Sequence, residues 1–149
     1  MRSVKGNDFD VDYKFGRIPV DYLLEKFPKR YRDITDQQEQ KECGDLYDYE
    51  LGINIEVKHD STKYRNFFLE EKTSEKNSGW ANNLLWCDVL LYKFSRDGFF
   101  WHVQFSEVRR IVRDCQQNNT WPLRKCSRSS AFGWCVPITV VRGAVKWFA

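Results

Sequence analysis

The sequence has little of what several protein classes require. It contains only two histidines, and none of its five cysteines forms a Cys-x-x-Cys pair, so the ligand spacing of a structural zinc site is absent. No stretch approaches the roughly 20 apolar residues of a membrane-spanning helix, and the polar amino terminus lacks the apolar core of a signal peptide. We therefore expect a soluble, cytoplasmic protein with reduced thiols and no membrane partner. A Cys126–Cys135 disulfide stays open as an alternative.

The composition is that of a folded domain. A chain of 149 residues suits one domain spanning 1–149, and its 42% hydrophobic and 16% aromatic residues can fill a core. Charge is distributed unevenly, because residues 1–88 hold 14 Lys and Arg against 18 Asp and Glu, whereas residues 89–149 hold 10 against 3. This asymmetry suits either a carboxylate metal site beside a surface that binds a polyanion, or two solvated faces of a soluble protein.

Apolar periodicity predicts an α/β fold in a single domain, with a central mixed β-sheet flanked by helices. Residues 1–14 are polar, and we expect them to be loosely ordered. We expect helices over 18–27 and 107–117, with Ser106 capping the second, and strands over 45–49, 53–58, 65–71, 88–94 and 99–105. Residues 73–79 and 118–130 are predicted as loops, residues 80–87 as a helix or an ordered loop, and the last strands flank Gly143.

The sequence Glu56-Val57-Lys58 ends one of these apolar strands. Side chains alternate faces along a strand, so Glu56 and Lys58 share one face and Val57 points to the other. If the chain turns back around Gly52, Asp45 lies opposite Glu56 on the neighbouring strand, whereas Asp48 lies on the opposite face. The spacing therefore predicts that Asp45, Glu56 and Lys58 converge.

Two carboxylates and an ammonium on one patch are typical of a site for a hard divalent cation. Mg²⁺ binds oxygen ligands, keeps several waters and uses one or two carboxylates together with substrate phosphate. A lysine beside such a metal can orient the activated water that attacks phosphorus. The alternative is an ordinary salt bridge on an exposed sheet face, which contributes little to stability.

The segment "GDLYDYELGINIEVKHD" resembles the catalytic hairpin of the PD-(D/E)XK nuclease superfamily, which includes restriction endonucleases, junction resolvases and many phage nucleases. The flanking segments are also similar to members of this family. Gln40 precedes the metal-binding Asp, "RNFFLEE" resembles the next strand, and "SGWANNLLWCDVLLYKF" resembles a Gly-Trp loop that leads to an apolar strand. The resemblance covers about residues 16–94. Gly44 stands where the motif has proline.

The resemblance implies a restriction-endonuclease-like αβββαβ core and a metal-dependent endonuclease that hydrolyses DNA phosphodiester bonds. It implies Mg²⁺ or Mn²⁺ as cofactor, and it is compatible with a phage-encoded protein in a bacterial host and with a homodimer. Family members often add a carboxylate from the first helix; Asp21 and Glu25 both qualify, and we favour Glu25. The implied catalytic residues are Asp45, Glu56, Lys58, Glu25 and Glu70, and the metal set is Asp45, Glu56 and Val57.

The DNA surface is predicted from the basic half of the chain. The expected phosphate contacts are Arg109, Arg110, Arg113, Arg124, Lys125 and Arg128, and Trp80 is the expected base-stacking residue. The alternative is a solvated helix face and loop. Two other functions stay open: a catalytically inactive module of the same fold that binds DNA or a protein, and a structural subunit of a larger complex. The form of DNA and any sequence specificity are not predicted.

Overall fold

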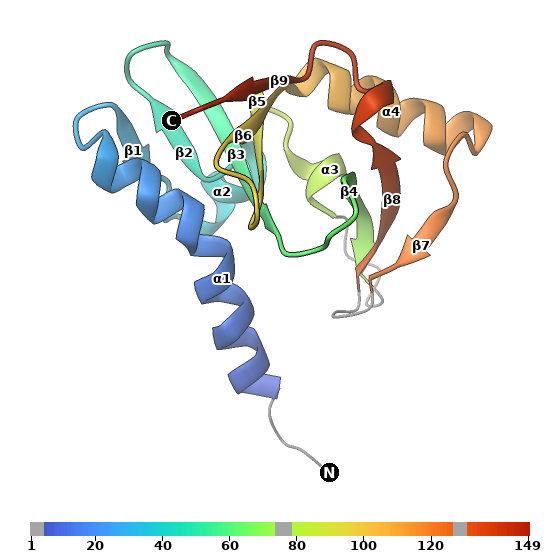
Figure 1. Cartoon of the computed structure of the whole chain (residues 1–149), viewed down its shortest axis with the longest axis horizontal. Coiled ribbons are helices and arrows are strands. Elements are labelled where there is room, and N and C mark those ends of the chain that lie inside the picture. The colour runs from blue at the N-terminus through green and yellow to red at the C-terminus, as the bar shows by residue number, and fades with distance from the viewer. Residues whose placement is uncertain (1–4, 74–78, 127–130) are drawn as a thin grey trace.

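The computed structural model describes residues 5–73, 79–126 and 131–149, so Arg128 and most of the predicted 73–79 loop lie outside the described residues. Figure 1 shows the order of the elements. They are α1 (Lys5–Lys26), β1 (Tyr31–Asp33), α2 (Gln37–Cys43), β2 (Leu46–Asp48), β3 (Ile53–Asp60), β4 (Asn66–Thr73), α3 (Trp80–Asn83), β5 (Val89–Phe94), β6 (Phe100–Gln104), α4 (Phe105–Asn118), β7 (Leu123–Lys125), β8 (Ala131–Pro137), the short 3₁₀ turn η1 (Ile138–Val140) and β9 (Val145–Trp147).

The expected α/β fold with a mixed sheet is confirmed, but the strands form two sheets rather than one. Six strands follow the order β1-β2-β3-β5-β6-β9, and three form a second sheet in the order β4-β8-β7. Among the described strands, only the β3–β5 pair is parallel. The 65–71 strand was expected in the same sheet as the hairpin and instead pairs with β8. Hydrophobic alternation indicates which face of a strand is buried, not which strand pairs with it.

The helices also differ from expectation at their ends. Residues 5–14 are helical rather than loosely ordered, because extending an existing helix avoids the cost of nucleation. The helix still ends two residues before Pro28. Helix α4 begins at Phe105 with Gln104 at its cap, so Ser106 is not the cap. Within the described residues, no helix is both long and apolar enough to cross a bilayer.

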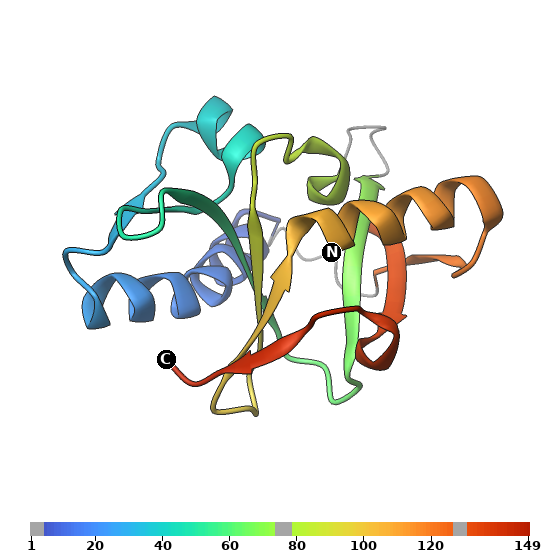
Figure 2. The same cartoon turned by 90° about the horizontal axis from the view of Figure 1, so that it is seen from above.

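Two hydrophobic cores lie on the two faces of the larger sheet. Alternate residues of β5 divide between them: Leu90 and Tyr92 pack toward β4, β8 and α4, whereas Val89 and Leu91 pack toward α1. Figure 2 shows α4 crossing beside β4 and β8, on the side away from α1. The predicted apolar face of α4 is confirmed, since its members are buried: Val108, Ile111, Val112 and Cys115.

Tyr92 joins the two sheets where they come together. Its hydroxyl donates to Asp60 Oδ2 at 2.7 Å and accepts a hydrogen bond from the backbone N–H of Phe68 at 3.1 Å. The residue belongs to β5, whereas its partners belong to β3 and β4. This fixes β4 near the end of β3 and leaves a space between the sheets beside the hairpin. The cysteines are free thiols, so the Cys126–Cys135 disulfide is not formed.

Candidate active site

Asp45 lies opposite Glu56 across the β2–β3 hairpin, as the sequence predicted. The pairing of β2 with β3 has the predicted register, and the Asp45 N–H donates to the Ile55 carbonyl at 2.8 Å. The Asp45 carboxylate then accepts a hydrogen bond from the Val57 N–H at 2.8 Å through Oδ2. The main-chain pairing of β2 with β3 ends at Leu46 and Ile55. Beyond that point, the Asp45 side chain takes the place of a main-chain acceptor for β3. It holds the Asp45 carboxylate in place beside Glu56.

Gly44 places Asp45 at this position. Its φ is +112°, and a Cβ there would lie 2.7 Å from the Ile55 carbonyl oxygen. Proline is confined to φ near −65° and every other L residue is strained at positive φ. The chain therefore approaches β3 so closely that only glycine fits. This explains why this hairpin has glycine where the PD-(D/E)XK motif has proline.

Glu56 and Lys58 project from β3 toward the second sheet. In the parallel β3–β5 pairing they align with Leu90 and Tyr92, which face that side. The Lys58 Nζ lies 2.9 Å from Glu56 Oε2. Val57, which was included in the predicted metal set, turns its side chain into the core beneath α1 and is 5% exposed. Its side chain therefore offers no ligand, and its main-chain N–H instead holds Asp45.

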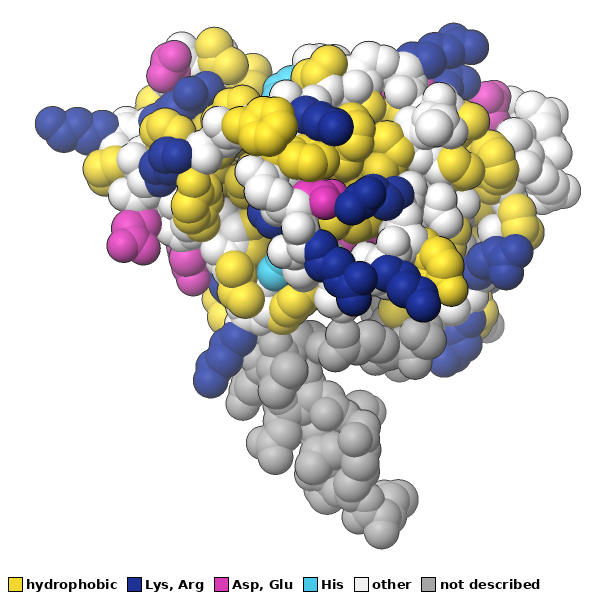
Figure 3. All heavy atoms as spheres, in the orientation of Figure 1, with side chains coloured by type: hydrophobic (Ala, Val, Ile, Leu, Met, Phe, Trp, Pro, Cys, Tyr) yellow, Lys and Arg dark blue, Asp and Glu magenta, His cyan; other side chains and the backbone are white. Residues whose placement is uncertain are grey.

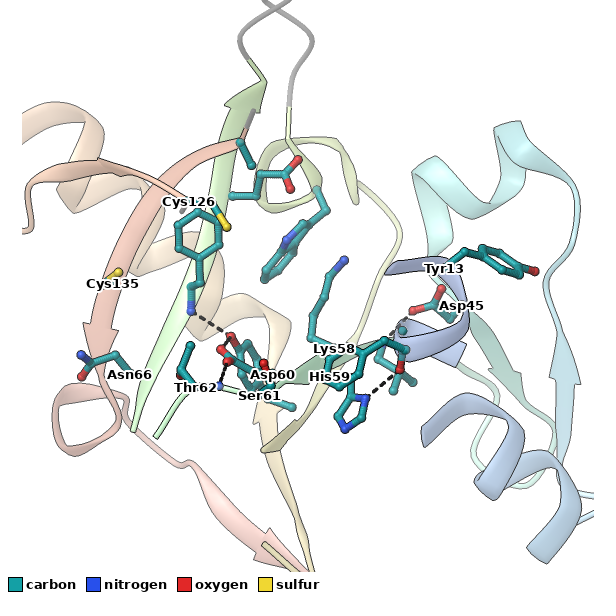
Figure 4. Close-up of a pocket in the computed structure, with 18 of the residues that line it drawn as sticks. Tyr13, Asp45, Lys58, His59, Asp60, Ser61, Thr62, Asn66, Cys126 and Cys135 are labelled. Atoms are coloured by element: carbon teal, nitrogen blue, oxygen red, sulfur yellow. Dashed lines mark hydrogen bonds between the residues drawn. The ribbon is translucent and has the colours of Figure 1, made fainter. Parts of the chain in front are cut away.

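A cavity of about 690 Å³ opens between the two sheets beside the hairpin. It is bounded by α1, β3, β4, α3, β7 and β8, and both Asp45 and Lys58 line it. Figure 4 shows Lys58 extending from β3 into this space, with Asp45 on one side and Cys126 on the other. The Lys58 Nζ is 4.9 Å from the centre of the Trp80 ring. Glu56 is only 5% exposed and is not among the lining residues, so Asp45 and Lys58 form the accessible part of the site.

The surroundings of Glu56 raise its pKa well above that of an ordinary glutamate. Burial raises its pKa from 4.5 to about 8, and the charge of the neighbouring Asp45 adds to this effect, while Lys58 opposes it. Asp45 and Glu56 lie close together, so their negative charges repel. A divalent cation bound between them would take the place of the proton and balance both charges.

Lys58 stays an ammonium ion in the same environment. Burial lowers its pKa, but the adjacent Glu56 and Asp45 carboxylates raise it by more, so the net direction is upward. Glu70 from β4 also acts on Lys58, and burial raises the pKa of Glu70 itself. The structure therefore brings Glu70 to the predicted site from the second sheet, although β4 does not pair with the hairpin.

The donor set fits a magnesium ion better than a metal held by protein alone. Among residues 5–73, 79–126 and 131–149, no three His, Cys, Asp or Glu side chains gather as a ligand group. Asp45 and Glu56 make a pair, and Mg²⁺ accepts one or two carboxylates when waters and substrate phosphate complete its octahedron. Zinc would need more nitrogen or sulfur ligands than this site offers.

The carboxylates predicted from the first helix do not reach the cavity. Helix α1 passes it with residues 13–20, and Glu25 lies five residues beyond Val20, about 7.5 Å further along the axis. Glu25 is exposed, and Asp21 is bound to Arg17 at 2.8 Å. The structure therefore does not bring Glu25 to the cavity, because helical spacing alone does not fix which turn of α1 meets the hairpin.

The predicted basic residues divide into structural and accessible groups. The Arg109 guanidinium donates to the carbonyls of Leu84, Leu85 and Cys87 at 3.1, 3.2 and 2.8 Å, so it fixes the segment before β5. Arg110 is paired with Glu107 and Asp114. Arg113 is exposed on α4 but does not line the cavity.

Arg124 and Lys125 lie on β7 at the border of the cavity. Both are exposed, and they lie opposite the α1 wall. Figure 3 shows Lys and Arg side chains gathered over the region between α1 and the smaller sheet. Of the predicted phosphate contacts, these two are the ones that the structure brings to the catalytic candidates. Trp80 also lines the cavity, but it is partly buried beside Phe105 rather than fully exposed.

Three residues near the site were missed or only partly anticipated. Arg17 lines the cavity and forms a two-bond ion pair with Asp33 at 2.9 Å; its spacing from Val20 on α1 was the only available signal. Gly79 lets the chain pass β4, since a Cβ there would lie 2.4 Å from the Glu70 carbonyl oxygen. This contact places Trp80 against Lys58. Gln40, which the resemblance singled out only by its place before Asp45 in the sequence, also lines the cavity.

No protein-family model matches this chain, and neither the curated proteins nor the solved structures contain a significant match.

Proposed function

We propose that this chain is a Mg²⁺- or Mn²⁺-dependent deoxyribonuclease that hydrolyses phosphodiester bonds. The observation that carries the proposal is the hairpin register, which unites Asp45, Glu56 and Lys58 at the edge of a cavity with a basic border. An ordinary surface salt bridge needs neither the buried Glu56 beside Asp45 nor the glycine-dependent approach of the two strands. The resemblance to PD-(D/E)XK nucleases supports the same assignment.

The residues have separate roles in this proposal. Asp45 and Glu56 would hold the cation, and a bound cation would supply an activated water and balance charge on the phosphate. Lys58 remains protonated, so it does not take the proton of the attacking water; it orients that water and stabilises the added negative charge on phosphorus. Glu70 lies across the cavity with a raised pKa, which suits a group that accepts the proton of the water. The new P–O bond forms as the bond to the leaving oxygen breaks.

The alternative function is a catalytically inactive member of the same fold that binds DNA or a protein. This alternative is favoured because Asp21 and Glu25 do not line the cavity. Without a carboxylate from α1, the site has only the two carboxylates of the hairpin together with Glu70. The two functions differ in one measurement: incubation of DNA with the chain in Mg²⁺, Mn²⁺ and EDTA. The nuclease cuts with either metal and not in EDTA, whereas the binding module retains DNA and cuts it in none.

A further inference from the structure

The candidate active site lies in a cavity between the two sheets. Its volume of about 690 Å³ falls in the range of sites that bind one small ligand. Residues of α1 and of the smaller sheet line the same cavity as Asp45 and Lys58. A phosphate that meets Asp45 and Lys58 therefore lies between these two walls.

The walls of the cavity combine aromatic rings with positive charge. Tyr64, in the loop between β3 and β4, is 67% exposed and lines the cavity, as do the partly buried Phe68 and Trp80. Arg124 lies at the border, on β7. Aromatic platforms interleaved with basic groups are typical of proteins that bind single strands, because bases stack on the rings while the phosphates follow the cations.

We propose that the substrate is unpaired DNA: a single strand, or the unpaired tail of a duplex. This inference rests on the proposed nuclease function, since it concerns the strand that reaches Lys58, but it makes an independent claim about binding. The unpaired strand lies between α1 and β7, with a base on Tyr64 and a phosphate at Arg124. We expect an unpaired strand to be preferred over an intact duplex, because its bases are free to stack on the aromatic rings of the cavity wall.

The test uses one labelled DNA strand in three forms: alone, in a blunt duplex, and in a duplex that leaves it a long unpaired tail. Binding is measured by fluorescence anisotropy with Ca²⁺ in place of Mg²⁺, and cleavage is measured with Mg²⁺. We expect the single strand to bind at least tenfold more tightly than the blunt duplex, and cuts in the tailed duplex to lie in the tail. Equal or tighter binding of the blunt duplex would overturn the inference.

Two tyrosine variants make the test specific to the cavity wall. Tyr64→Ala removes an exposed ring that lines the cavity, and Tyr49→Ala removes a ring of similar exposure, 59%, in the β2–β3 turn outside the cavity. Loss of one stacked base should weaken single-strand binding about tenfold in Tyr64→Ala, with Tyr49→Ala unchanged. Equal affinity of the two variants would refute the stacking role of Tyr64. Duplex cleavage equal to single-strand cleavage would refute the strand preference and leave the nuclease standing, whereas tight single-strand binding without cleavage in any metal would refute the nuclease and leave the strand preference standing.

Discussion

Replacing Glu56 by Gln should stabilise the metal-free protein at alkaline pH. The pKa of Glu56 is raised to about 8 in the folded protein, from an ordinary value of 4.5. A carboxyl whose pKa is raised by folding contributes stability that is complete below the unfolded pKa and is lost as pH rises through the folded one. Between pH 5 and pH 8 this group alone should reduce the free energy of unfolding by about 3 kcal/mol. The Gln variant cannot ionise, so it should lack this decline.

The comparison is made by urea unfolding in EDTA, followed by tryptophan fluorescence, from pH 5 to pH 8. At pH 8 the Gln variant should be more stable than the wild type by on the order of 2 kcal/mol, because loss of the ion pair with Lys58 offsets part of the gain. Mg²⁺ should then stabilise the wild type at pH 8 and leave the variant unchanged. If Glu56 were only the partner of a structural salt bridge, its removal would leave Lys58 without that partner and lower stability. A variant less stable than the wild type at pH 8 would therefore refute the raised pKa of Glu56.

Three further predictions concern residues that support the site. Gly44→Ala should cost about 1–3 kcal/mol of stability in urea unfolding because of its positive φ and its contact with β3, whereas Gly16→Ala, which has open space around it on α1, should gain roughly 0.5–1 kcal/mol. Arg109→Ala should cost about 1–3 kcal/mol by leaving carbonyls without a donor, and Arg113→Ala should lie within about 0.5 kcal/mol of the wild type; equal effects would contradict the structural role. Arg124→Glu should weaken DNA binding and lower its salt dependence more than Arg113→Glu does, as measured by anisotropy over a salt series, and the reverse order would move the phosphate surface to α4.

The local geometry of the site was predictable because it depends on short-range rules. Strand alternation and a turn at Gly52 are sufficient to place Asp45 opposite Glu56, and the same alternation directs Val57 away from Lys58. The apolar face of α4 follows from helical spacing in the same way. None of these predictions needs knowledge of how distant segments pack.

The surroundings of the site could not be predicted in the same way. The second sheet depends on β4 pairing with β8, 58 to 71 residues later in the chain, and no local pattern encodes that partner. The position of Glu25 could not be predicted for a related reason, since helical spacing fixes the face of α1 but not the turn that meets the hairpin. Arg109 was predicted as a phosphate contact because it is a basic residue on a helix. Its three carbonyl partners could not be foreseen, since tertiary packing sets the path of the segment that carries them.

DNA cleavage by a Lys58→Ala variant is the most direct test of the proposed nuclease and of the role of Lys58 in it. Lys63 is an exposed lysine a few residues away that does not line the cavity, so Lys63→Ala is the matched control. With single-stranded and tailed DNA in excess Mg²⁺, the Lys58 variant should cut on the order of 10²–10³-fold more slowly than the wild type, while its DNA affinity stays largely intact and Lys63→Ala cuts at the wild-type rate. Cleavage by Lys58→Ala at the wild-type rate would contradict the role of Lys58. No cleavage by the wild type with any metal or DNA form would contradict the nuclease function itself.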